Sequence, residues 1–169
     1  MPEMVKLGPK SMEGLIWDAK GNSNIVEIQI SHQQNIINSM QFSYASQSGE
    51  EDILMDVYAS KTYGEPHGLK FSTVTIRYPE EYLVSVSGEY DKGKLISLVF
   101  CTNKKRHGPF GRTGGGSSDV SIDEFNFEFG PRFCFGGFHG SVKEGCLHAI
   151  GVYVKPHEII DADSKFLNF

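Results

Sequence analysis

The chain has 169 residues, 39% of them hydrophobic, and carries a formal net charge of −5 at pH 7. That length suits one well-buried domain, since domains typically have roughly 100–150 residues. The negative charge argues against a general nucleic-acid binder and against binding to anionic membranes, because both surfaces are negatively charged themselves. The first residues lack a basic and then apolar leader, and no run of about 18 apolar residues follows, so we expect a cytoplasmic or nucleocytoplasmic protein without membrane insertion.

Seven segments alternate apolar with small or polar residues between Gly, Pro, Asn or Asp, which is the pattern of antiparallel strands. No long segment has helical periodicity, so the sequence predicts an all-β fold such as a sandwich, barrel or prism. Residues 105–118 are predicted to be a glycine-rich loop, and residues 156–169 a C-terminal extension. The predicted strands are 25–31, 39–45, 70–78, 82–90, 95–103, 124–130 and 147–154.

A weak internal repeat links three of these strands. The segments 37–44, 95–102 and 147–154 each have an apolar residue, any residue, a Ser or Ala and then an apolar residue. Ser39, Ser97 and Ala149 fall 58 and then 52 positions apart. Even spacing of this kind favours three similar modules around a common axis, although any two strands resemble each other under simple alternation.

The cysteines and histidines raise two chemical possibilities. Cys146 and His148 are two positions apart, so on a regular strand they share a face, where a base could activate a thiol. Cys134 and His139 add metal-ligand types, but the spacing matches no paired-cysteine zinc pattern. Ordinary strand residues explain all four better, so no enzyme and no metal site is predicted. Three cysteines are also too few, and odd in number, for a disulfide framework.

Four groups of residues carry a family resemblance. GPKSMEGLIWD (8–18), YPEEYLVSVSGEY (78–90), FCTNKKRHGPFG (100–111), and FGGFHG (135–140) with LHAIGVYV (147–154) occur in the order found in jacalin-related lectins. The likeness covers roughly residues 5–155, so we define a lectin domain at 1–155. The resemblance implies a β-prism of three four-stranded antiparallel sheets with pseudo-threefold symmetry. It also implies carbohydrate binding without catalysis, cofactor or required metal.

The resemblance places a sugar pocket between a glycine-rich N-terminal loop and a Gly-x-x-x-Asp loop. Here His148 stands at the position of the Asp and Glu144 at that of the Gly, while Lys10, Ser11 and Met12 replace a tryptophan and paired glycines. An imidazole offers one donor and one acceptor, far fewer acceptor sites than a carboxylate. We therefore expect altered or weakened sugar binding. The candidate residues are Gly14, Glu144, Gly145, Cys146, Leu147 and His148, with the backbone N–H groups of Cys146 and Leu147 as donors.

A second sugar site is implied for the first repeat, where some family members carry an Asp on the corresponding loop. Asn38 stands at that position, with Gln34 and Asn35 before it. An Asn side chain keeps one acceptor and adds donors, so sugar contact remains chemically possible. The simpler interpretation is that Asn38 is a turn residue at the start of a strand.

These observations favour a plant lectin of the mannose-binding, single-chain branch. Thirteen residues precede Gly14, whereas galactose-specific members are cleaved to free the amino terminus of the corresponding glycine. The expected partners are mannose- or glucose-type glycans or glycoproteins, with a defence or stress role by analogy alone. The alternative is a protein-interaction module that kept the prism and lost the sugar. A homodimer is the default expectation.

Overall fold

The computed structural model describes residues 3–46, 56–112, 121–129 and 134–156, and within them the regular secondary structure is strand. Most strands are short runs of β-branched and aromatic residues alternating with polar ones, as a pleated and half-buried surface requires. The strands are β1 (Val5–Leu7), β2 (Leu15–Asp18), β3 (Ile25–Gln33), β4 (Ile36–Ala45), β5 (Val57–Ala59), β6 (Tyr63–Gly64), β7 (Lys70–Thr75), β8 (Leu83–Asp91), β9 (Lys94–Thr102), β10 (Arg106–Gly111), β11 (Ile122–Glu128), β12 (Phe135–Lys143) and β13 (Cys146–Val154).

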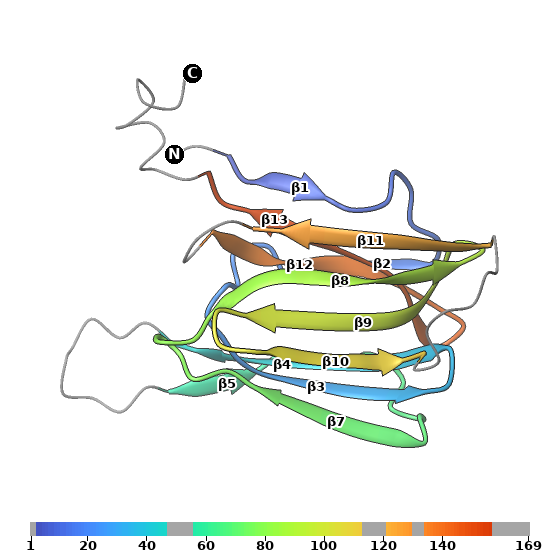
Figure 1. The fold of residues 1–169 in the computed structure, drawn as a ribbon, viewed down its shortest axis with the longest axis horizontal. Coiled ribbons are helices and arrows are strands. Elements are labelled where there is room, and N and C mark those ends of the chain that lie inside the picture. Colours follow the sequence, from blue (N-terminus) through green and yellow to red (C-terminus); the bar gives the residue numbers. More distant parts are fainter. Residues whose placement is uncertain (1–2, 47–55, 113–120, 130–133, 157–169) are drawn as a thin grey trace.

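These strands form three antiparallel sheets, which Figure 1 shows stacked around one interior. The strand orders are β1-β13-β12-β2, β10-β9-β8-β11 and β5-β4-β3-β7, and the short β6 also pairs with β4. The predicted all-β prism of three four-stranded sheets is confirmed, with β6 as an addition to one sheet. The first and last parts of the chain share a sheet, because β1 and β2 flank the C-terminal hairpin.

The predicted threefold repeat is visible in the central hairpin of each sheet. The hairpins β3–β4, β8–β9 and β12–β13 each close through a two-residue turn, at 34–35, 92–93 and 144–145. In the second and third turns both residues have positive φ, as a type I′ turn requires, and Gly93 and Gly145 supply the second position. Ser39, Ser97 and Ala149 each lie four residues after their turn.

Each hairpin also contains a β-bulge near its turn. The pairing register shifts so that Asn38, Ile96 and His148 have no residue directly opposite them. An inserted residue of this kind bends the strand and redirects its own side chain. The three bulge residues are therefore structurally equivalent. Two of them, Asn38 and His148, are predicted site residues.

The core draws on all three sheets. Phe42, Phe100 and Phe138 come from different sheets and are each 0% exposed. Phe42 and Phe138 stack with ring centroids 4.9 Å apart, and Phe100 meets Phe138 edge-on at 6.1 Å. One continuous cluster of buried residues surrounds them. The described part of the chain thus packs as one unit around a shared interior.

The sequence was misleading in one segment. Residues 105–118 were expected to be a loop, but residues 106–111 form β10 and pair with β9. Pro109 and the neighbouring glycine conceal the strand, and the register shifts between His107 and Phe110, which is where a residue without an N–H is tolerated. Residues 113–118 and most of the predicted C-terminal extension, 157–169, lie outside the described residues.

Candidate functional site

The predicted loop 144–148 is a tight hairpin end. Glu144 and Gly145 are the two turn residues, Cys146 and Leu147 begin β13, and His148 is the bulge residue. The Leu147 side chain is 0% exposed and belongs to the core, so only its backbone is available to a ligand. The turn contacts another sheet's loop, because the Gly145 carbonyl accepts a hydrogen bond from the backbone N–H of Glu65 at 2.8 Å.

His148 is mostly covered, with 12% of its side chain exposed. Its Nε2 lies 3.6 Å from a carboxylate oxygen of Glu13, and its Nδ1 is buried without a hydrogen-bond partner among the described residues. Burial lowers the pKa of His148, the Glu13 carboxylate opposes that change, and Lys143 adds to it. A histidine with a pKa below its ordinary value is neutral at pH 7. The imidazole therefore brings no positive charge to the site under neutral conditions.

Glu13 was not among the residues predicted from the sequence. It lies on the N-terminal loop directly before Gly14, and one of its carboxylate oxygens is 3.4 Å from Lys143 Nζ. Its side chain is 66% exposed, so the carboxylate can accept hydrogen bonds from a ligand. The only sequence signal was its place next to the predicted glycine. A carboxylate therefore lies on the wall opposite position 148, where the sequence places none.

Gly14 joins the N-terminal loop to this hairpin. It has a φ of +96°, and a Cβ built on it would overlap the carbonyl oxygen of Val142 and crowd Lys143. The next residue, Leu15, begins β2 opposite Val142. A side chain at position 14 is therefore excluded by backbone conformation and by packing. The close approach accounts for a glycine at position 14 even if no ligand binds there. It also brings Glu13 to His148.

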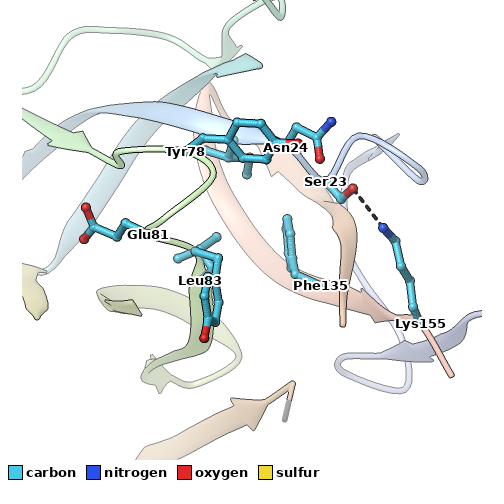
Figure 2. A pocket seen from close by; sticks show the side chains of 9 residues that line it. Ser23, Asn24, Tyr78, Glu81, Leu83, Phe135 and Lys155 are labelled. Atoms are coloured by element: carbon cyan, nitrogen blue, oxygen red, sulfur yellow. Dashed lines mark hydrogen bonds between the residues drawn. The ribbon is translucent and has the colours of Figure 1, made fainter. Parts of the chain in front are cut away.

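A cleft of about 440 Å³ opens beside Glu13 and His148. It lies between the N-terminal loop, the turn 92–93 and β11, and its volume is in the range of small-molecule sites. By contrast, the pocket in Figure 2, beside Lys155 and Ser23, holds only about 20 Å³, room for one water molecule. The cleft is lined by polar and aromatic side chains and by small residues, among them Gly8, Pro9, Ser11, Glu13, Tyr90, Phe125, Phe127 and His148.

The residues of the predicted second sugar site are not brought together. Gln34 and Asn35 form an exposed turn, but Asn38 is only 5% exposed. Its side-chain oxygen is buried, and Gly68 lies so close that a Cβ there would touch it. The Gly68 N–H donates a hydrogen bond to Ser31 Oγ at 2.8 Å, which holds Gly68 against the Asn38 side chain. Asn38 therefore faces the protein interior in this arrangement.

The cysteine and histidine candidates are also dispersed. Cys134 precedes β12 and Cys146 follows its far end, about 30 Å away along the strand. His139 is buried and shares a 2.8 Å hydrogen bond with the Leu7 carbonyl, which fixes the end of β1. No hydrogen bond joins Cys146 to His148 in the described structure. Among the described residues no group of three His, Cys, Asp or Glu is arranged to hold a metal ion, and no helix could cross a membrane.

Comparison with known proteins identifies close structural relatives. Residues 7–153 match the family model described as Jacalin-like lectin domain. Jacalin-related lectin 2 of Arabidopsis thaliana is 32% identical over 176 residues, covering 92% of this chain and 89% of that protein. Protein RESTRICTED TEV MOVEMENT 1 of the same plant is 32% identical over 170 residues, covering 92% and 90%.

Solved structures are similar over the same extent. A mannose-binding lectin from champedak superposes with a TM-score of 0.70 at 27% identity, covering 92% of this chain and 99% of that one. A mannose-binding jacalin-related lectin from Ananas comosus superposes with a TM-score of 0.66 at 26% identity, covering 91% and 99%. The similarity therefore extends over almost all of both chains.

Proposed function

Since the chain belongs to the jacalin-related lectin family, a family of binding proteins rather than enzymes, we propose that it binds mannose- or glucose-type glycans weakly, with Glu13 as the carboxylate acceptor. The observation that carries the proposal is the exposed Glu13 carboxylate beside His148, at the mouth of a cleft. A carboxylate can accept hydrogen bonds from two neighbouring sugar hydroxyls at once. The choice of mannose is supported by the two mannose-binding lectins with similar structures.

Weak affinity follows from the surroundings of Glu13. Its carboxylate already lies near Lys143 and His148, so a sugar must compete with both contacts. A dissociation constant on the order of 1 mM, about −4 kcal/mol, is expected for one sugar. Useful avidity would then require several sites, which a homodimer supplies. A role in plant stress or defence belongs to the same proposal, since the relatives named above are plant proteins. The proposal also includes a cytoplasmic location.

Ligand-detected NMR with mannose, glucose, galactose and a high-mannose oligosaccharide tests this proposal. We expect saturable binding of mannose and glucose by the natural protein, and at least a tenfold loss in Glu13→Gln. The matched control is Glu80→Gln, which neutralises an exposed carboxylate outside the cleft lining and should leave the affinity unchanged. His148→Asp should tighten binding about tenfold, because it restores a carboxylate on the bulge.

Three outcomes separate the alternatives. Equal binding by the natural protein and Glu13→Gln would mean that another group accepts the sugar hydroxyls. Binding by His148→Asp alone would show an intact scaffold whose natural pocket does not serve sugars. If neither the natural protein nor His148→Asp binds any of the sugars, the carbohydrate proposal is excluded and the protein-interaction alternative is favoured.

A further inference from the structure

We propose that the cleft beside Glu13 takes the aromatic aglycone of a glycoside whose sugar lies at Glu13 and His148. This inference rests on the proposed function and deepens it, because it names aryl glycosides as the preferred ligand class over free sugars. It is carried by three aromatic side chains in the cleft, by the way the neighbouring sheet edges close, and by the position of the polar groups.

A row of aromatic rings forms one wall of the cleft. The ring centroids of Tyr90 and Phe125 are 5.1 Å apart, and those of Phe125 and Phe127 are 5.2 Å apart. Phe125 is opposite Gly88, which in turn is opposite the fully buried Leu98, so these residues share the core-facing side of their sheet. Phe125 and Phe127 nevertheless stay only partly buried. Side chains with a core orientation therefore remain accessible here.

The other two junctions between sheets are closed by ring contacts. Between β2 and β6, Trp17 and Tyr63 stack with centroids 4.1 Å apart. Between β10 and β3, Phe110 meets the His32 ring edge-on at 5.6 Å. Trp17, Tyr63 and His32 are all buried as a result. The same threefold architecture thus has two junctions sealed by large side chains.

At the third junction the facing segment carries small residues. Gly8, Pro9 and Ser11 line the cleft together with residues of β11, and their small side chains leave the space between them open. The space left is about 440 Å³, which suits a small molecule. Aromatic rings stack favourably on one another in offset or edge-on arrangements. An aromatic group from a ligand would therefore take the place that a protein side chain takes elsewhere.

The polar groups of the cleft fix the direction of such a ligand. The Tyr90 hydroxyl is already used, since it accepts from the Ile150 N–H at 3.1 Å and donates to the Ile150 carbonyl at 3.2 Å. That pair of bonds holds the ring in place, and since Tyr90 is only 9% exposed, the partly buried Phe125 and Phe127 provide most of the accessible aromatic surface. His148 Nε2 lies 3.6 Å from a Glu13 carboxylate oxygen, so these two side chains form one polar end beside the aromatic wall. A sugar bonded there continues into the aromatic part of the cleft through its glycosidic substituent.

Isothermal titration with methyl α-mannoside, p-nitrophenyl α-mannoside and p-nitrophenol tests the inference. We expect the aryl mannoside to bind at least tenfold more tightly than the methyl mannoside. Ser11→Phe places a ring in the cleft, and Phe127→Ala removes one, so in both variants the ratio of the two affinities should fall toward one. Phe71→Ala is the control, because Phe71 is 69% exposed on β7, and it should keep the ratio of the natural protein. Circular dichroism establishes that each variant is folded, and Ser11→Phe remains decisive if Phe127→Ala unfolds.

The results distinguish this inference from the proposal on which it rests. Equal affinities for both mannosides would overturn the aglycone site and leave sugar binding standing. Binding of p-nitrophenol as tight as that of its mannoside, lost in Ser11→Phe, would support an aromatic site and overturn the sugar contact at Glu13. If none of the three ligands binds, both the aglycone site and the sugar site are overturned.

Discussion

His148 shows how one residue decides what a repeated backbone position can do. Asn38 and Ile96 occupy the equivalent bulges in the other two hairpins. Asn38 lies under Gly68, Ile96 is buried and apolar, and only His148 meets a carboxylate, that of Glu13. The backbone has three similar bulge positions, but the side chains there and the residues packed against them leave only one accessible polar site among the three. Symmetry of the fold therefore does not imply symmetry of binding.

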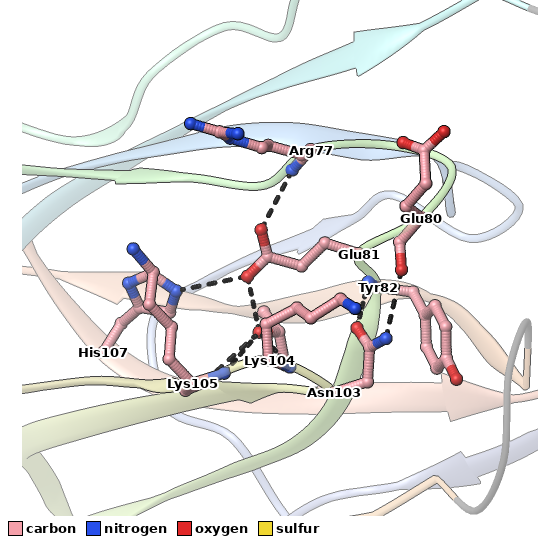
Figure 3. Close-up of polar contacts among 9 residues, drawn as sticks. Arg77, Glu80, Glu81, Tyr82, Asn103, Lys104, Lys105 and His107 are labelled. Carbon is pink, nitrogen blue, oxygen red and sulfur yellow. Dashed lines mark hydrogen bonds and ion pairs between the residues drawn. The ribbon is translucent and has the colours of Figure 1, made fainter.

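Glu81 is a second residue whose surroundings determine its chemistry. It is 4% exposed, and Figure 3 shows its contacts to the Arg77 backbone N–H and the His107 ring. The Thr102 hydroxyl also donates a hydrogen bond to the Glu81 carboxylate at 2.6 Å. Burial raises the pKa of Glu81, but the hydrogen bonds from Thr102 and Arg77, together with the nearby His107 and Lys105, hold it below its ordinary value. The ionised carboxylate thereby ties the loop before β8 to the β9–β10 hairpin.

We predict that Glu81→Gln lowers the free energy of unfolding at pH 7 by about 1–3 kcal/mol, the cost of weakening buried hydrogen bonds to a charged group. Because the folded-state pKa is depressed, this stabilisation is complete above the ordinary glutamate value of about 4.3 and is lost as the pH falls through the folded-state value. Urea unfolding at pH 7 to 3 should therefore converge for the natural protein and the variant. Glu80→Gln, at the exposed neighbouring position, should leave the free energy of unfolding almost unchanged. An equal loss in Glu80→Gln would refute the stabilising role of the Glu81 carboxylate.

At the scale of elements, the junction between the N-terminal loop and the β12–β13 hairpin depends on Gly14. We predict that Gly14→Ala costs about 3 kcal/mol or more, since overlap with Val142 adds to backbone strain. Gly21→Ala is a matched control, because Gly21 has a similar φ of +91° but nothing within 4 Å of a built Cβ. It should cost only about 1–2 kcal/mol, the strain alone. Chemical denaturation measures both, and equal costs would show that the close approach contributes nothing.

Element prediction followed alternation rather than position in the sheet, because the edge strands β7 and β11 were predicted while the short edge strands β1, β2, β5 and β10 were not. β8 and β11 show the alternation clearly, because more buried and more exposed residues follow one another along them. β2 and β10 are short and partly exposed, and β10 contains a proline and two glycines. β2 pairs with β12, a partner distant in the chain that local alternation does not report. β10 pairs with the preceding β9, but its proline and the shift in register hide it from a pattern search.

At the scale of the whole molecule, three sheets share one core, so we expect a single cooperative unfolding transition. Tyr63 seals one junction by stacking on Trp17, and we predict that Tyr63→Ala lowers the free energy of unfolding by about 3–5 kcal/mol. Tyr58→Ala should cost less than about 1 kcal/mol, since Tyr58 is 50% exposed on β5. Urea unfolding followed by tryptophan fluorescence measures both. A small loss in Tyr63→Ala would mean that the sheets do not depend on this contact.

Alternation and turn residues such as Gly93 and Gly145 act locally, so the all-β class, the central hairpins and the threefold repeat are predictable from the amino-acid sequence. The hairpin end at His148 is predictable as well. The folded chain alone reveals that Glu13 meets His148, that Gly68 covers Asn38 and that a cleft stays open beside Phe125. Each of these depends on segments far apart in the chain being brought together by the core. Contacts of that kind follow from how three sheets close on one another, which no local pattern records.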